Sequence, residues 1–152
     1  MKLDCKVNSA SEIWQILIQD SSSTIGAGLT GLTNASSGLV AYYSRNTDTA
    51  PTVISLVSMT LGSYTSGGFK EISSANMPGS YQFCPPDAAL ISGAKSCMIT
   101  LKGATNMALL PIEVQLVAYD PYNAVNLGLV SLPNATANTI GGLPVNVGGL
   151  LI

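Results

Sequence analysis

The apolar residues of this chain recur mainly at every second position, in short runs between turns rich in glycine, proline and asparagine. Successive side chains of a β-strand point to opposite faces, so this period is typical of half-buried strands. The clearest example lies at residues 112–119, where every second side chain from Ile112 to Ala118 is apolar. Long helical stripes are lacking. The sequence therefore predicts an all-β fold.

Seven segments have a strand pattern: residues 13–18, 39–45, 52–57, 69–72, 80–84, 96–101 and 112–119. Their spacing of roughly 8–20 residues predicts an antiparallel β-sandwich. We expect a turn at residues 76–79 and one helical turn at 87–91, capped by Asp87. The predicted core comes from Trp14, Ile16, Ile18, Tyr42, Ile54, Phe83, Ile99, Val114 and Leu116.

Charge is scarce and histidine is absent. Only 9% of residues are charged and the formal net charge is −2, against roughly 25% charged residues in an average protein. These values exclude a basic nucleic-acid surface of the usual kind, and the lack of histidine removes triads and histidine metal ligands. A surface this poor in charge predicts burial in an assembly, faces covered by hydroxyl groups, or both.

No run of apolar residues approaches the ~20 that a membrane-spanning helix requires, so no contact with a membrane is expected. The charged N-terminus is not followed by the apolar segment of a secretory signal. Cys5, Cys84 and Cys97 contain no CxxC pair, and we expect them to be reduced and buried. A bridge between Cys84 and Cys97 stays open.

Residues 121–152 differ from the rest of the chain, because no lysine, arginine, aspartate or glutamate follows Asp120. Many residues there are apolar and glycines interrupt them, so this short segment cannot build its own core. We therefore predict a sandwich domain at 1–120 and an assembly or docking extension at 121–152, with a disordered C-terminus as the alternative. The expected interface residues are Val125, Leu127, Leu129, Leu132, Leu143 and Val145.

Several motifs occur in an order that resembles structural proteins of tailed bacteriophages. They lie at residues 18–32, 67–72, 75–79, 86–88, 101–108, 119–129, 132–135 and 141–144. The similar proteins are fibre, baseplate or appendage components with an immunoglobulin-like N-terminal module. Asn126 stands where that family usually has a basic residue.

This resemblance implies an immunoglobulin-like sandwich that assembles as a homo-oligomer, a trimer by expectation, with other virion proteins. In longer members, stalk or receptor-binding domains follow the module, whereas this chain stops at Ile152. That difference favours a connector, cement or decoration role over direct receptor binding. The expected location is the virion, assembled in the cytoplasm of the bacterial host.

Catalysis has little support in the sequence, because the carboxylates are scattered singly. A glycosidase needs two carboxylates that face one cleft, and Asp20 and Asp120 are one such candidate pair. Turn and cap roles are the other explanation of both residues. The glycines at 26, 28 and 31 lack a following helix and predict a loop, not a nucleotide site. We expect no enzyme activity, cofactor or metal.

Outward tyrosines offer an alternative function, because a tyrosine ring combines an apolar face with a hydroxyl group. One of Tyr42 and Tyr43 must face outward if they lie on a strand. Tyr43 and Tyr122 are the predicted glycan contacts of a carbohydrate-binding module on the virion surface. Ordinary packing in the core or on the sheet surface is the alternative role of these tyrosines.

Overall fold

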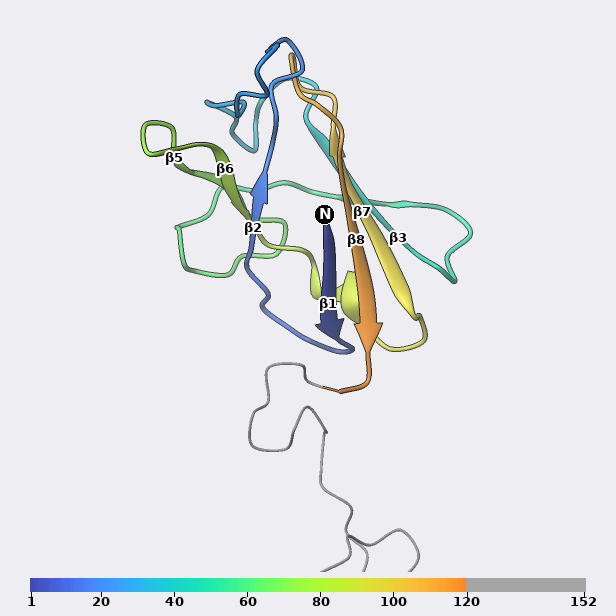
Figure 1. Ribbon diagram of the computed structural model, residues 1–152. Coiled ribbons are helices and arrows are strands. Elements are labelled where there is room, and N and C mark those ends of the chain that lie inside the picture. The colour runs from blue at the N-terminus through green and yellow to red at the C-terminus, as the bar shows by residue number, and fades with distance from the viewer. Residues whose placement is uncertain (120–152) are drawn as a thin grey trace, which may run out of the picture. The chain divides into compact units, whose positions relative to one another are not determined.

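A computed structural model describes residues 1–119 of the chain as two β-sheets packed face to face (Figure 1). The five-stranded sheet has the order β1 (Lys2–Lys6), β8 (Leu110–Val117), β7 (Ser96–Lys102), β3 (Val40–Arg45) and β4 (Thr52–Ile54). The three-stranded sheet has the order β2 (Trp14–Leu17), β6 (Met77–Phe83) and β5 (Phe69–Ser73). The predicted all-β sandwich is confirmed.

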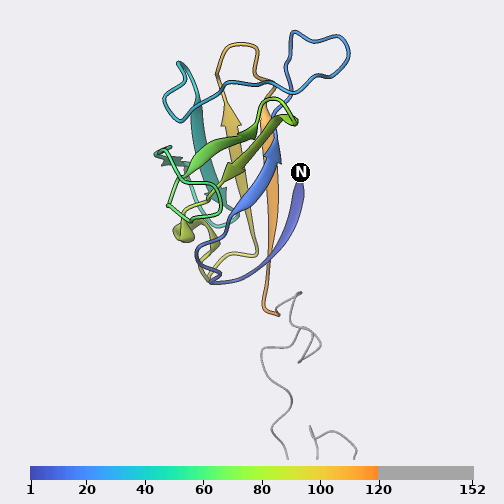
Figure 2. The same cartoon turned by 90° about the vertical axis from the view of Figure 1, so that its left-hand side faces the viewer.

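Figure 2 shows the two layers, with β2, β5 and β6 in front of β3, β7 and β8. The side chains between the layers form one apolar core in which Tyr81, Phe83, Ile99 and Ile112 are completely buried. The ring centroids of Phe69 and Tyr81 lie 4.8 Å apart in a stacked arrangement. Each large side chain buried in this way contributes roughly 1.5–3 kcal/mol.

Eight of the nine predicted core residues are buried, and Tyr42 is the exception. Its neighbours Ala41 and Tyr43 face the core, so strand alternation turns Tyr42 outward. Residues 39–43 are all apolar, so the sequence does not show which of them point inward and which point outward. The prediction of Tyr42 as a core residue is therefore wrong.

Most strand pairs are antiparallel, but β1 runs parallel to β8, with Lys2 opposite Glu113 and Lys6 opposite Val117. The β1 strand is absent from the strands predicted from the sequence, because its five residues include two lysines and an aspartate. An edge strand tolerates such charges, which discourage pairing with another chain.

Two local predictions also need correction. Met77, Pro78 and Gly79 belong to β6, and the turn lies at residues 74–76 instead of 76–79. A 3₁₀ helix, η1 (Asp87–Leu90), occupies the predicted helical turn, but its N-cap residue is Pro86 and Asp87 makes no capping hydrogen bond. The Asp87 carboxylate instead accepts hydrogen bonds from the Ser11 backbone N–H at 2.9 Å and the Tyr64 hydroxyl at 2.8 Å.

The long loop between β2 and β3 is attached to the three-stranded sheet by side chains of that sheet. The Tyr81 hydroxyl donates to the Leu29 carbonyl at 2.6 Å and accepts from the Leu32 N–H at 3.2 Å. Burial raises the pKa of Tyr81 above its ordinary value. At Gly79, with φ +79°, a Cβ atom would lie 2.5 Å from the Gly28 Cα, so this close approach requires glycine.

The chain divides into a compact unit at Met1–Val117 and a second unit at Ala118–Ile152. The strands, the 3₁₀ helix and the core all belong to the first unit. Within the described residues, no helix has the length and apolar character needed to cross a membrane.

Candidate functional site

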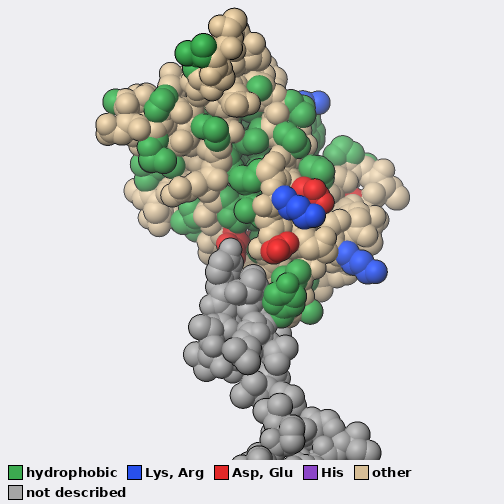
Figure 3. All heavy atoms as spheres, in the orientation of Figure 1, with side chains coloured by type: hydrophobic (Ala, Val, Ile, Leu, Met, Phe, Trp, Pro, Cys, Tyr) green, Lys and Arg blue, Asp and Glu red, His purple; other side chains and the backbone are tan. Residues whose placement is uncertain are grey.

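The outer face of the five-stranded sheet carries several apolar side chains. Its outward side chains alternate along each strand with buried ones and include Val40, Tyr42, Val53, Met98 and Pro111. Val53 is 61% exposed and Met98 is 44% exposed. Figure 3 shows one side of the molecule, on which apolar and uncharged polar side chains predominate and charged ones are few and scattered.

Tyr42 and Tyr43 point to opposite sides of β3. Tyr43 is opposite Ile99 in the strand register and packs against the core, whereas Tyr42 is opposite Thr100 on one side and Val53 on the other. The alternation therefore places Tyr42, and not the predicted Tyr43, on the outer face. Glycan contact remains a prediction for both Tyr43 and Tyr122, and Tyr122 lies outside the described residues.

A hollow of about 260 Å³ opens beside Tyr42 on this outer face. It is lined by Tyr42, Pro51, Thr100 and Lys102, so β3, β7 and the segment before β4 all contribute. The Lys102 ammonium lies 5.9 Å from the centroid of the Tyr42 ring, at the outer limit of a cation–π contact. The hollow thus combines an aromatic face, a hydroxyl group, a proline ring and a positive charge.

The positive charge at this hollow has no carboxylate partner in the part of the chain that the structure describes. The two ion pairs among the described residues join Lys2 to Glu113 at 3.7 Å and Arg45 to Asp48 at 2.9 Å. Lys102 is exposed and takes part in neither. Its ammonium is therefore available to an anionic group from outside.

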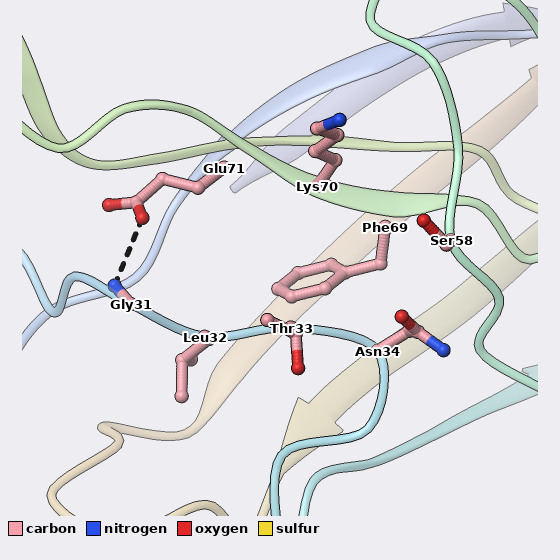
Figure 4. A pocket seen from close by; sticks show the side chains of 8 residues that line it. All are labelled: Gly31, Leu32, Thr33, Asn34, Ser58, Phe69, Lys70 and Glu71. Carbon is pink, nitrogen blue, oxygen red and sulfur yellow. Dashed lines mark hydrogen bonds between the residues drawn. The ribbon is translucent and has the colours of Figure 1, made fainter.

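A second cleft, also of about 260 Å³, lies between the β2–β3 loop and β5 (Figure 4). Its lining includes Asn34, Ser58, Lys70 and Glu71, but these side chains do not converge on one point. Figure 4 shows the Glu71 carboxylate at one end, turned toward Gly31, while Asn34 and Ser58 lie at the other end. This divergence favours a structural role for the cleft.

Glu71 helps to attach the loop. Its Oε2 atom accepts a hydrogen bond from the Gly31 N–H at 3.0 Å, and its buried Oε1 atom has no hydrogen-bond partner among residues 1–119. Thr33 also forms an isolated antiparallel β-bridge with Lys70 of β5. These contacts add the loop to the edge of the three-stranded sheet.

Asp20 has the turn role that the sequence predicts for it. Asp20 accepts hydrogen bonds from the Ser22 hydroxyl and N–H, and these lower the pKa of Asp20. Asp120, its candidate catalytic partner, lies outside the described residues. Residues 1–119 contain no group of three His, Cys, Asp or Glu side chains arranged to hold a metal ion.

All three cysteines are free and buried, as expected, so Cys84 and Cys97 do not form a bridge. Burial raises the pKa of Cys97 to about 11. The thiol therefore stays protonated at neutral pH and acts as a small apolar core residue.

The predicted assembly residues, Val125, Leu127, Leu129, Leu132, Leu143 and Val145, all lie outside the described residues. The structure therefore leaves them as predictions.

Sequence reasoning missed the hollow at Lys102. The signal available was the alternation at 97–102, which turns Thr100 and Lys102 to the same side, but the pairing with Tyr42 depends on a register that no sequence motif specifies.

Comparison with protein-family models, with curated proteins and with solved structures gives no match to this chain.

Proposed function

We propose that this chain is a non-enzymatic structural protein of a tailed-phage particle, in which residues 1–120 form the body and residues 121–152 attach it to sister chains and other virion proteins. The observation that carries this proposal is a sandwich core formed by residues between Cys5 and Leu116. In this proposal the apolar residues of 121–152 contribute to assembly.

The strand order agrees with the immunoglobulin-like module that the resemblance implies. In that module a B-E-D sheet faces a G-F-C sheet. The order β2-β6-β5 opposite β8-β7-β3 corresponds to this arrangement if β2 is taken as strand B. We therefore interpret the sandwich as immunoglobulin-like.

Attachment through residues 121–152 follows from burial of apolar side chains. An interface of standard size buries roughly 1,600 Å², and each Å² of apolar surface contributes about 25 cal/mol. Many identical copies in one particle add avidity. A connector and a capsid-surface cement or decoration protein both use this mechanism, and both belong to the proposal.

The test replaces Leu127 and Leu129 of the full chain by aspartate. Light scattering then measures the molar mass of the purified protein in solution. We expect the unchanged chain to be a homo-oligomer, a trimer by the proposal, and the double variant to be a folded monomer that no longer enters phage particles. Leu109→Asp is the matched control, because Leu109 is already 59% exposed in the sandwich. A double variant that keeps the oligomer and enters particles would refute the role of the extension.

A second candidate function is carbohydrate binding on the surface of the particle. The observation that favours it is the hollow beside Tyr42, which combines an exposed aromatic face with hydrogen-bonding groups. This candidate is compatible with assembly through residues 121–152, because the two use different parts of the chain.

A further inference from the structure

We propose that the hollow formed by Tyr42, Pro51, Thr100 and Lys102 binds a sugar that carries a carboxylate, such as a uronic acid unit of a longer glycan. This inference rests on the second candidate function, and it names the class of sugar and the residues that select it. Of the two predicted glycan contacts, Tyr43 packs against the core instead of lining this hollow, and Tyr122 lies outside the described residues.

The aromatic side of the hollow suits the apolar face of a pyranose ring. Tyr42 is half-buried and lines the hollow, so part of its side chain is accessible there. Val53 and Thr100 are its register partners on the two adjacent strands, and they fix its place in the sheet. Pro51 adds a second rigid apolar surface without the loss of side-chain entropy on binding.

The size of the hollow limits the ligand to about one ring. Its volume of about 260 Å³ lies just below the roughly 300 Å³ at which pockets for drug-sized molecules begin. A single sugar unit therefore occupies it, while the rest of a chain extends over the exposed outer face.

The charge of Lys102 selects an acidic sugar over a neutral one. Among the described residues, the Lys102 ammonium lies over the Tyr42 ring and forms no ion pair. It is thus a local positive charge on a chain whose net charge is −2. A neutral sugar would leave the ammonium without an anion, whereas a carboxylate on the ring could pair with it. Exposed ion pairs are weak, so we expect a preference of about three- to fivefold.

The experiment titrates the full chain with glucuronate and, separately, with glucose, and follows the backbone amide signals by NMR. Both sugars should shift the amides of Tyr42 and Thr100, and glucuronate should bind about three- to fivefold more tightly. Concentrations up to about 50 mM cover the millimolar affinities of weak sites.

Three variants separate the two contributions. Lys102→Gln should remove the preference, so that glucuronate and glucose bind this variant with equal affinity. Tyr42→Ala should abolish both, while Tyr42→Phe, which retains the ring, guards against loss of binding through misfolding. Lys70→Gln is the matched control, because Lys70 is an exposed lysine on the other sheet.

The outcomes distinguish this inference from the function on which it rests. Equal affinities for glucose and glucuronate would overturn the acidic preference and leave carbohydrate binding in place. Absence of any shift with both sugars would overturn both. Equal binding of glutarate, which mimics an acidic side chain of a protein, would show that the hollow recognises a carboxylate alone and would overturn the assignment to sugars.

Discussion

The two sheets of the sandwich differ in how they are held together. In the five-stranded sheet, β3, β7 and β8 are six to eight residues long and pair along most of their length. In the three-stranded sheet, β2 has four residues and the pairing of β5 with β6 contains a register shift after Glu71. Side-chain hydrogen bonds of Glu71 and Tyr81 and the close approach of Gly28 to Gly79 supplement this shorter ladder.

The outer faces of the two sheets also differ in the side chains that they present. On the three-stranded sheet, Gln15, Lys70 and Gln82 point outward, and the Gln82 side chain accepts a hydrogen bond from the Gly62 N–H at 2.8 Å. On the five-stranded sheet, Val53 and Met98 are exposed beside Tyr42. The Gln82 side chain of the small sheet thus holds a loop, whereas the exposed side chains of Val53 and Met98 on the large sheet are apolar and hold none.

The largest effect is expected at the glycine contact of the three-stranded sheet. Gly79→Ala adds a Cβ atom that would lie 2.5 Å from the Gly28 Cα and 2.7 Å from the Ile18 carbonyl oxygen, at a φ of +79°. The left-handed conformation alone costs about 1–2 kcal/mol, and overpacking adds a further ~1–3 kcal/mol. Chemical denaturation measures the loss in free energy of unfolding.

Gly62→Ala is the control for this variant, because Gly62 has the similar φ of +80° but no atom within 4 Å of its Cβ position. Its free energy of unfolding should fall only by the cost of the left-handed conformation. Equal losses in the two variants would show that the close approach of Gly28 and Gly79 does not constrain the small sheet.

A smaller effect is expected when a tyrosine hydroxyl is removed from each sheet. Tyr81→Phe leaves the Leu29 carbonyl and the Leu32 N–H without their partner, so it should lower the free energy of unfolding by about 1–3 kcal/mol. Tyr42→Phe, on the outer face of the large sheet, should change it by less than ~0.5 kcal/mol. Similar losses would contradict the contrast between the sheets.

The smallest effect concerns the turn between β3 and β4. Hydrogen bonds from the Arg45 side chain and backbone N–H lower the pKa of Asp48 below its ordinary value. A lowered carboxyl pKa contributes stability above the unfolded pKa of about 4, and that stability is lost as the pH falls through the folded pKa. Asp48→Asn should therefore flatten the decrease in Tm below about pH 4, and an unchanged profile would exclude this contribution.

The sequence predicted most strands, because alternation along the chain is a local property. Thr100 and Lys102 could be assigned to one side of their strand from the pattern at 97–102 alone. Tyr42 could not, since apolar residues on both sides of it obscure the alternation, and its partners are set by pairing with β4 and β7. The hollow therefore depends on the pairing of β3 with β7, two strands far apart in the sequence, and patterns along one chain do not contain that information.

The β1 strand illustrates a second limit. Its alternation is weak and its charges are typical of a loop, yet it pairs with β8 along its whole length and buries Cys5 against the core. An edge position permits these charges, and only the tertiary arrangement reveals the edge.

The central claim is that the sandwich is complete without residues 121–152, which serve assembly. The most direct test compares residues 1–120 with the full chain by sedimentation velocity and chemical denaturation. We predict that the shortened chain sediments as a monomer and unfolds in one cooperative transition, whereas the full chain sediments as an oligomer. A shortened chain that fails to fold, or that keeps the oligomer of the full chain, would contradict the claim.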